Sequence, residues 1–82
     1  MTNAEVALLK RVRDEAHSRM SRARSEVNDA ADQLLADGSG LQEFIDKRRA
    51  GIAAARMFVA VDTAYKQALR ETRRDTPPSA AA

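Results

Sequence analysis

A single short break divides an otherwise uninterrupted run of helix-compatible sequence. Before Pro77 the chain has no proline, and two of its three glycines lie together at Gly38 and Gly40. Proline and glycine are the residues that most disfavour the interior of a helix. The sequence therefore predicts an all-α fold of two long helices that double back at this break.

The ends of both helices carry recognisable signals. Thr2 and Glu5 have the spacing of a capping box, and so do Ser39 and Gln42 after the glycine turn. Pro77 cannot continue a helix, so the last residues are expected to form a short disordered tail. The predicted organisation is one helical hairpin over residues 1–76, with helices at about 3–36 and 40–75, a turn at 37–40 and a tail at 77–82.

Apolar residues recur at alternating spacings of three and four in both arms, as they do in antiparallel coiled-coil-like hairpins. The stripe of the first helix comprises Val6, Leu9, Arg13, Ala16, Met20, Ala23, Val27, Ala30 and Leu34. The stripe of the second comprises Leu41, Phe44, Arg48, Gly51, Ala55, Phe58, Asp62, Tyr65 and Leu69. The alanines of the first stripe favour a close approach of the bulkier second helix.

Charged residues interrupt these stripes at matching levels. An antiparallel register that turns near residue 38 places Arg13 almost opposite Asp62, which predicts an ion pair between the arms. The same register places Arg48 near Asp29 and Glu26. The alternative is that these charges lie on a slightly rotated, solvated face.

The second helix has more apolar surface than the first helix can cover. From residue 50 to residue 61 only Arg56 is neither apolar nor glycine, and a second apolar series lies about 100° from the first. Helices of four-helix bundles carry two such faces, so we expect two hairpins to pair as a homodimer. A helix of another protein is the alternative occupant, and a partly exposed alanine-rich helix is the plainest reading. The predicted interface residues are Ala50, Ala54, Met57, Val61, Ala64 and Ala68.

Charge is unevenly distributed along the chain. Residues 25–46 contain six acids and no lysine or arginine, although the whole chain has a net charge of +2. A possible acidic docking tip at the turn would comprise Asp29, Asp32, Asp37, Glu43 and Asp46. A possible basic surface would comprise Lys10, Arg11, Lys66, Arg70, Arg73 and Arg74. Solvation alone would also explain both sets.

No motif in the sequence specifies a reaction. The chain has no cysteine and one histidine, so thiolate and histidine-rich metal sites are excluded. Residues 14–17 spell the DEAH box of helicases, but the phosphate-binding loop with which that motif acts is missing. We therefore expect no enzyme activity, no cofactor, no metal and no small-molecule substrate.

The composition indicates a small helical protein that acts through other macromolecules. No apolar stretch approaches the roughly 20 residues of a bilayer-spanning helix, and no secretory signal is visible, so a cytoplasmic location is expected. The predicted function is a non-catalytic interaction module, adaptor or assembly component that acts through helix packing. The alternative is an accessory protein that binds the phosphate backbone of nucleic acid without sequence specificity.

Overall fold

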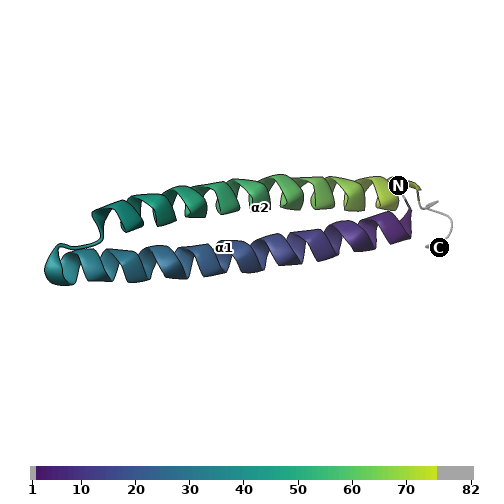
Figure 1. The fold of residues 1–82 in the computed structure, drawn as a ribbon. Coiled ribbons are helices and arrows are strands. Elements are labelled where there is room, and N and C mark those ends of the chain that lie inside the picture. The colour runs from purple at the N-terminus through teal and green to yellow at the C-terminus, as the bar shows by residue number, and fades with distance from the viewer. Residues whose placement is uncertain (1, 76–82) are drawn as a thin grey trace.

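The computed structural model is a hairpin of two helices, α1 (Asn3–Asp37) and α2 (Leu41–Asp75), which pack side by side in opposite directions (Figure 1). The structure describes the backbone of residues 2–75 and the side chains of residues 2–73. The predicted tail at 77–82 lies outside the described residues. Neither helix is long and apolar enough to cross a membrane.

The N-terminus of α1 and its end at the turn are capped by local hydrogen bonds. The hydroxyl of Thr2 accepts a hydrogen bond from the backbone N–H of Glu5 at 3.2 Å, which satisfies one of the free donors of the first turn. At the other end the N–H of Gly38 donates to the carbonyl of Leu34 at 2.9 Å. The helix therefore continues one residue beyond the predicted end, to Asp37.

The turn differs from the predicted capping box of Ser39 and Gln42. The Ser39 hydroxyl donates to the carboxylate of Asp37 and accepts from the amide of Gln33, so it is engaged with α1. The first hydrogen bond of α2 runs from Phe44 N–H to the carbonyl of Gly40, at 2.9 Å. Asp37, a member of the predicted acidic tip, therefore organises the turn.

Gly38 is expected to contribute measurably to stability. Its φ of 74° lies in the left-handed region, and a Cβ added there would meet no atom within 4 Å. A Gly38→Ala variant should therefore lose about 1–2 kcal/mol of unfolding free energy through backbone strain alone. Urea denaturation followed by circular dichroism measures this loss, and an unchanged transition midpoint would contradict the strain argument.

The inner face of α1 is the predicted stripe. All nine positions of that stripe are buried or half-buried, and Ala31 is the one further described residue of α1 with such shielding. The stripe consists of two series spaced by seven residues, which is the seam of a coiled coil. The prediction for this helix is confirmed.

The inner face of α2 is rotated from the predicted stripe at its edges. Seven of the nine predicted positions are half-buried: Phe44, Gly51, Ala55, Phe58, Asp62, Tyr65 and Leu69. The other shielded positions among the described residues are Ile45, Thr72 and a seven-residue series that the stripe did not include, Lys47, Ala54, Val61 and Ala68. Leu41 and Arg48, predicted to face inward, are exposed. Lys47 takes the place expected of Arg48, and its ammonium lies 3.5 Å from the carboxylate of Glu26.

The core of the hairpin is thin. Among the described residues only Ala16, Ala30 and Ala68 are buried, and no large side chain is fully buried. Small residues allow the helices to approach closely, and the Cβ position of Gly51 lies 3.3 Å from a methyl group of Val27. Close approach of backbones thus replaces the burial of large side chains, which leaves much apolar surface in solvent.

Candidate partner-binding surface

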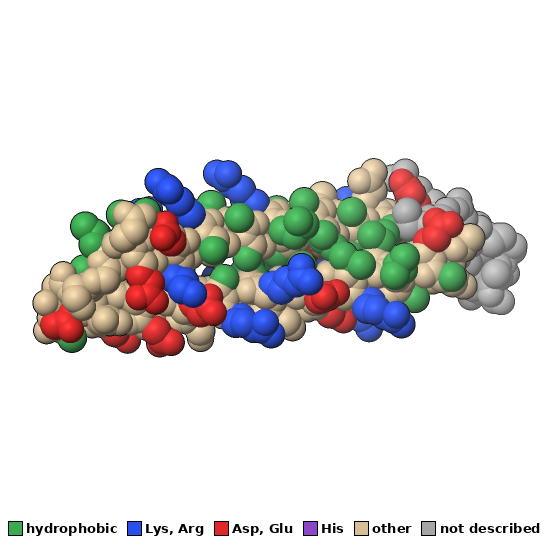
Figure 2. All heavy atoms as spheres, viewed as in Figure 1, with side chains coloured by type: hydrophobic (Ala, Val, Ile, Leu, Met, Phe, Trp, Pro, Cys, Tyr) green, Lys and Arg blue, Asp and Glu red, His purple; other side chains and the backbone are tan. Residues whose placement is uncertain are grey.

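One side of the hairpin carries an apolar surface to which both helices contribute, and we call it the Met57 face. A shallow hollow on this side is lined by Val12, Ala54, Met57 and Val61 together with the polar residues Glu15 and Arg19. Leu8 lies one helical turn before Val12 on the same side of α1. Hydrophobic side chains gather along the junction of the helices over the half of the rod nearer the chain ends (Figure 2). The Met57 face comprises Leu8, Val12, Ala50, Ala54, Met57, Val61 and Ala64.

The side chains of this face are more exposed than those of the seam, which is the row of shielded residues between the two helices. Met57 is 60% exposed, and Ala50 and Ala64, seven residues to either side, are also exposed. Ala54 and Val61 are half-buried because they belong to the seam and reach the face only at its edge. Ala68 is 2% exposed, so it packs against α1 and offers no surface to a partner. Ala68, which was predicted as an interface residue, is therefore not part of the Met57 face.

The opposite side of the hairpin has a groove of different character. Its floor is apolar, and arginines lie along it: the lining residues are Met20, Arg24, Val27, Arg48, Gly51, Ile52 and Ala55. Met57 is five positions after Ile52, so the two side chains point about 140° apart around α2. The groove and the Met57 face therefore lie on either side of the seam. The groove thus presents positive charge where the Met57 face presents mainly methyl and thioether groups.

Arg13 and Asp62 join the two helices in the half of the rod nearer the chain ends. The Nε of Arg13 donates to the Asp62 carboxylate at 2.6 Å, and Lys66 contacts the other oxygen of that carboxylate at 2.9 Å. The Arg13 guanidinium carbon also lies 5.7 Å from the ring centres of both Phe58 and Tyr65. One arginine therefore combines an ion pair with two cation–π contacts.

These contacts shift the ionisation of the pair. Hydrogen bonds from Arg13 and Lys66 lower the pKa of Asp62, and the bond to Asp62 raises the pKa of Arg13. Since the pKa of Asp62 is lower in the folded than in the unfolded chain, the carboxylate stabilises the fold at neutral pH. The stabilisation by the Asp62 carboxylate is fully present above the pKa that this group has in the unfolded chain, about 4, and is lost as the pH falls below that value.

An Asp62→Asn variant tests this assignment. It should be less stable than the wild type at pH 7, and the difference should shrink as the pH falls from about 4 toward the lowered pKa of Asp62 and below. Urea denaturation at pH 7, 4 and 2.5 measures it, with Asp32→Asn, at an exposed position, as the control for loss of a carboxylate. A difference that stays constant over this range would show that the Asp62 charge does not stabilise the hairpin.

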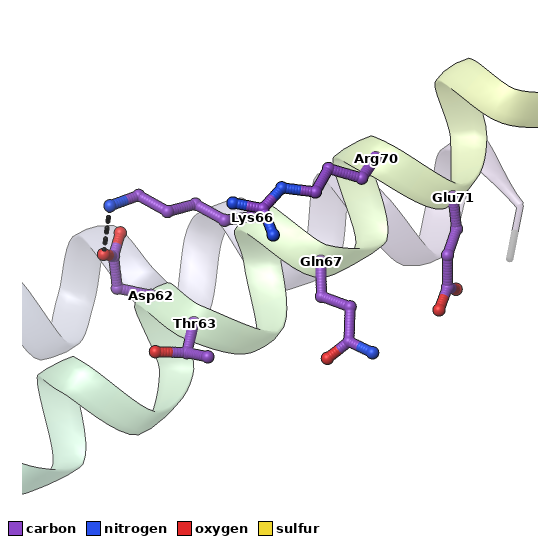
Figure 3. Close-up of a pocket in the computed structure, with 6 residues that line it drawn as sticks. All are labelled: Asp62, Thr63, Lys66, Gln67, Arg70 and Glu71. Carbon is purple, nitrogen blue, oxygen red and sulfur yellow. Dashed lines mark ion pairs between the residues drawn. The ribbon is translucent and has the colours of Figure 1, made fainter.

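A second groove lies on the outer surface of α2 beside this pair. All six lining residues belong to that one helix, and Lys66 and Arg70 lie along it toward Asp62, whereas Thr63, Gln67 and Glu71 point away from them (Figure 3). Five of the six are exposed. The groove is therefore a solvated strip of one helix, with Lys66 already engaged by Asp62.

The acidic residues near the turn are spread around the rod. Hydrogen bonds from the hydroxyl and backbone N–H of Ser39 lower the pKa of Asp37, and Asp46 accepts from the amide of Gln42 at 3.0 Å. Asp29, Asp32 and Glu43 are exposed. No group of three His, Cys, Asp or Glu side chains within residues 2–73 is close enough to hold a metal ion.

The predicted basic surface is divided between two helices. Lys10, Arg11, Arg70 and Arg73 are exposed and make no ion pair within the described side chains. Lys66 is paired with Asp62, and the side chain of Arg74 lies outside the described residues. Four of the six predicted cations are therefore available to an anionic partner.

The contribution of α1 to the Met57 face was not predicted from the sequence. Leu8 and Val12 are 58% and 40% exposed and lie just outside the inner stripe of their helix. Their spacing of four residues was the available signal, because residues one turn apart share a helix face. Both helices, and not α2 alone, therefore form the face.

Comparison with known proteins finds no relative: no family model, curated protein or solved structure matches this chain.

Proposed function

We propose that this chain is a non-catalytic interaction module whose Met57 face packs against a second hairpin to form a four-helix bundle. The observation that supports this proposal is that large apolar side chains lie on the surface of the hairpin and not in its core. Within the described residues, the large apolar side chains Leu8, Val12 and Met57 of this face are 40–60% exposed, while no large side chain is fully buried. A hairpin of this kind has its main apolar surface still available for packing.

Energetics favour a partner on this face. Fully burying a side chain such as Met, Leu or Val contributes about 1.5–3 kcal/mol, and small domains are marginally stable without such burial. This chain has no cysteine, so disulfides cannot compensate for a thin core. Covering Leu8, Val12 and Met57 with a second set of helices supplies the missing burial.

The concentration dependence of thermal unfolding tests the proposal. If folding is coupled to association, the midpoint rises with each tenfold increase in protein concentration, since mass action favours the associated state. Circular dichroism at 222 nm measures it. A midpoint that is independent of concentration from micromolar to millimolar would show that the hairpin folds alone.

A second candidate function is binding to the phosphate backbone of nucleic acid. The exposed cations Lys10, Arg11, Arg70 and Arg73 favour it, because they have no acidic partner within the described side chains. Such binding weakens steeply with salt. A mobility shift at low salt that disappears in an Arg70→Glu, Arg73→Glu variant supports this function, and no shift at low salt removes it.

A further inference from the structure

We infer that the occupant of the Met57 face is a second copy of this chain in antiparallel orientation, with α2 against α2 and the two turns at opposite ends. This inference rests on the proposed function and adds the identity and direction of the partner. Three features of the hairpin carry it: the position of the apolar surface, the charges beside it and the charge of the turn.

The part of the Met57 face that α2 contributes is centred on that helix. Met57 lies beside the midpoint of α2 (Leu41–Asp75), with Ala50 and Ala64 placed equally on either side. When two flat hairpins stack about a two-fold axis across the rods, α2 lies on α2, and the centred α2 part of the face covers itself. A two-fold axis along the rods would instead place α2 on α1, where polar residues share the face. Apolar burial between the two α2 helices therefore favours the antiparallel arrangement.

The charged pair beside Met57 fits the same axis. Glu15 and Arg19 line the hollow that Met57 lines, and they pair with each other at 3.0 Å in the single hairpin. An axis that passes Met57 also passes between these two residues, so Glu15 of each copy faces Arg19 of the other. Opposite charges then meet reciprocally, which is the requirement of an isologous interface.

The charge of the turn disfavours the parallel alternative. Residues 25–46 carry six acids and no base, so parallel rods would bring two strongly negative segments side by side. In the antiparallel arrangement the turns are separated by the length of a 35-residue helix, about 50 Å, which is several times the screening length at physiological salt.

Spin-label distances distinguish the two orientations, and the absence of cysteine allows single labels. A nitroxide at Leu35→Cys sits near the turn on an 85% exposed residue, so it removes no packing. Pulsed dipolar spectroscopy should give about 50 Å between two such labels in the antiparallel dimer. Parallel rods would bring them within about 25 Å, because packed helix axes lie 8–10 Å apart.

A label at Ser18→Cys, an exposed residue near the middle of α1, serves as the matched control. Both orientations place two such labels within about 30 Å, so this label reports only whether a dimer forms. A long Leu35 distance with a short Ser18 distance supports the inference. Short distances from both labels overturn it and leave the proposed function standing, and no dipolar signal from either label overturns both.

Discussion

A Met57→Asp variant should sediment as a single chain under conditions in which the wild type forms a dimer, and it should lose much of its helicity. The substitution places a carboxylate at the centre of the Met57 face, where association would bury it against the same carboxylate of the second copy. Burying an unpaired charge costs several kcal/mol, and each 1.4 kcal/mol is a factor of ten. We expect dimer affinity to fall more than about a hundredfold. Sedimentation velocity with circular dichroism on the same samples measures both effects.

Val59→Asp is the matched control for this variant. Val59 is 61% exposed, nearly the same as the 60% of Met57, but it lies two residues along α2 and therefore on another side of the helix. The same charge introduced at the same exposure should leave the dimer intact. A Met57→Asp protein that remains dimeric, or a Val59→Asp protein that dissociates as readily, would contradict the assignment of the face.

The second large effect is expected at the buried alanine of α2. Ala68 is 2% exposed, so it lies in the seam between the two helices, in the half of α2 nearer the chain ends. An Ala68→Leu variant must fit three additional carbon atoms into this space, which forces side chains or backbone to move. Overpacking of this kind costs about 1–3 kcal/mol. Urea denaturation should show the loss as a lower transition midpoint.

Ala60→Leu separates packing from helix propensity. Ala60 is exposed on the same helix, so leucine there makes the same change in intrinsic propensity without crowding the seam. Its unfolding free energy should stay within about 0.5 kcal/mol of the wild type. Equal midpoints for the Ala68 and Ala60 variants would show that the seam is loose enough to accept a leucine.

The two-helix fold was predictable from the sequence because its signals are local. The glycines at 38 and 40 and the absence of proline before residue 77 define the helices to within one residue. The alternation of three and four residues identified the inner face of α1 completely. Seven-residue periodicity carried this information without any knowledge of the partner helix.

The details that sequence reasoning missed depend on the relative rotation of the helices. Whether Lys47 or Arg48 meets Glu26 differs by one helical step of 100°, and both residues are basic. Ala68 and Ala64 look equivalent in composition, yet only Ala68 falls on a seven-residue series of the seam. Ser39 does not cap α2, because that helix begins at Leu41 and the Ser39 hydroxyl is engaged by Asp37 and Gln33. The supercoiling of the helices and the geometry of the turn determine which of two neighbouring residues faces the other helix.

The candidate site also has a part that could be predicted from local sequence signals and a part that depends on how the two helices are placed together. The exposed members of the Met57 face in α2 were named from the sequence, because an excess of apolar residues on one helix is a compositional fact. The contribution of Leu8 and Val12 required knowledge of which side of α1 adjoins Met57. The sandwich of Arg13 between Phe58 and Tyr65 likewise required the two helices to be placed together.

The molar mass of the purified wild-type chain tests the central claim most directly. Light scattering after gel filtration gives this mass independently of shape, which matters for a rod, and circular dichroism on the same fractions gives the helicity. The account predicts the mass of two chains together with high helicity. A monomer that retains high helicity at all concentrations would contradict it, because the hairpin would then be stable with its Met57 face in water.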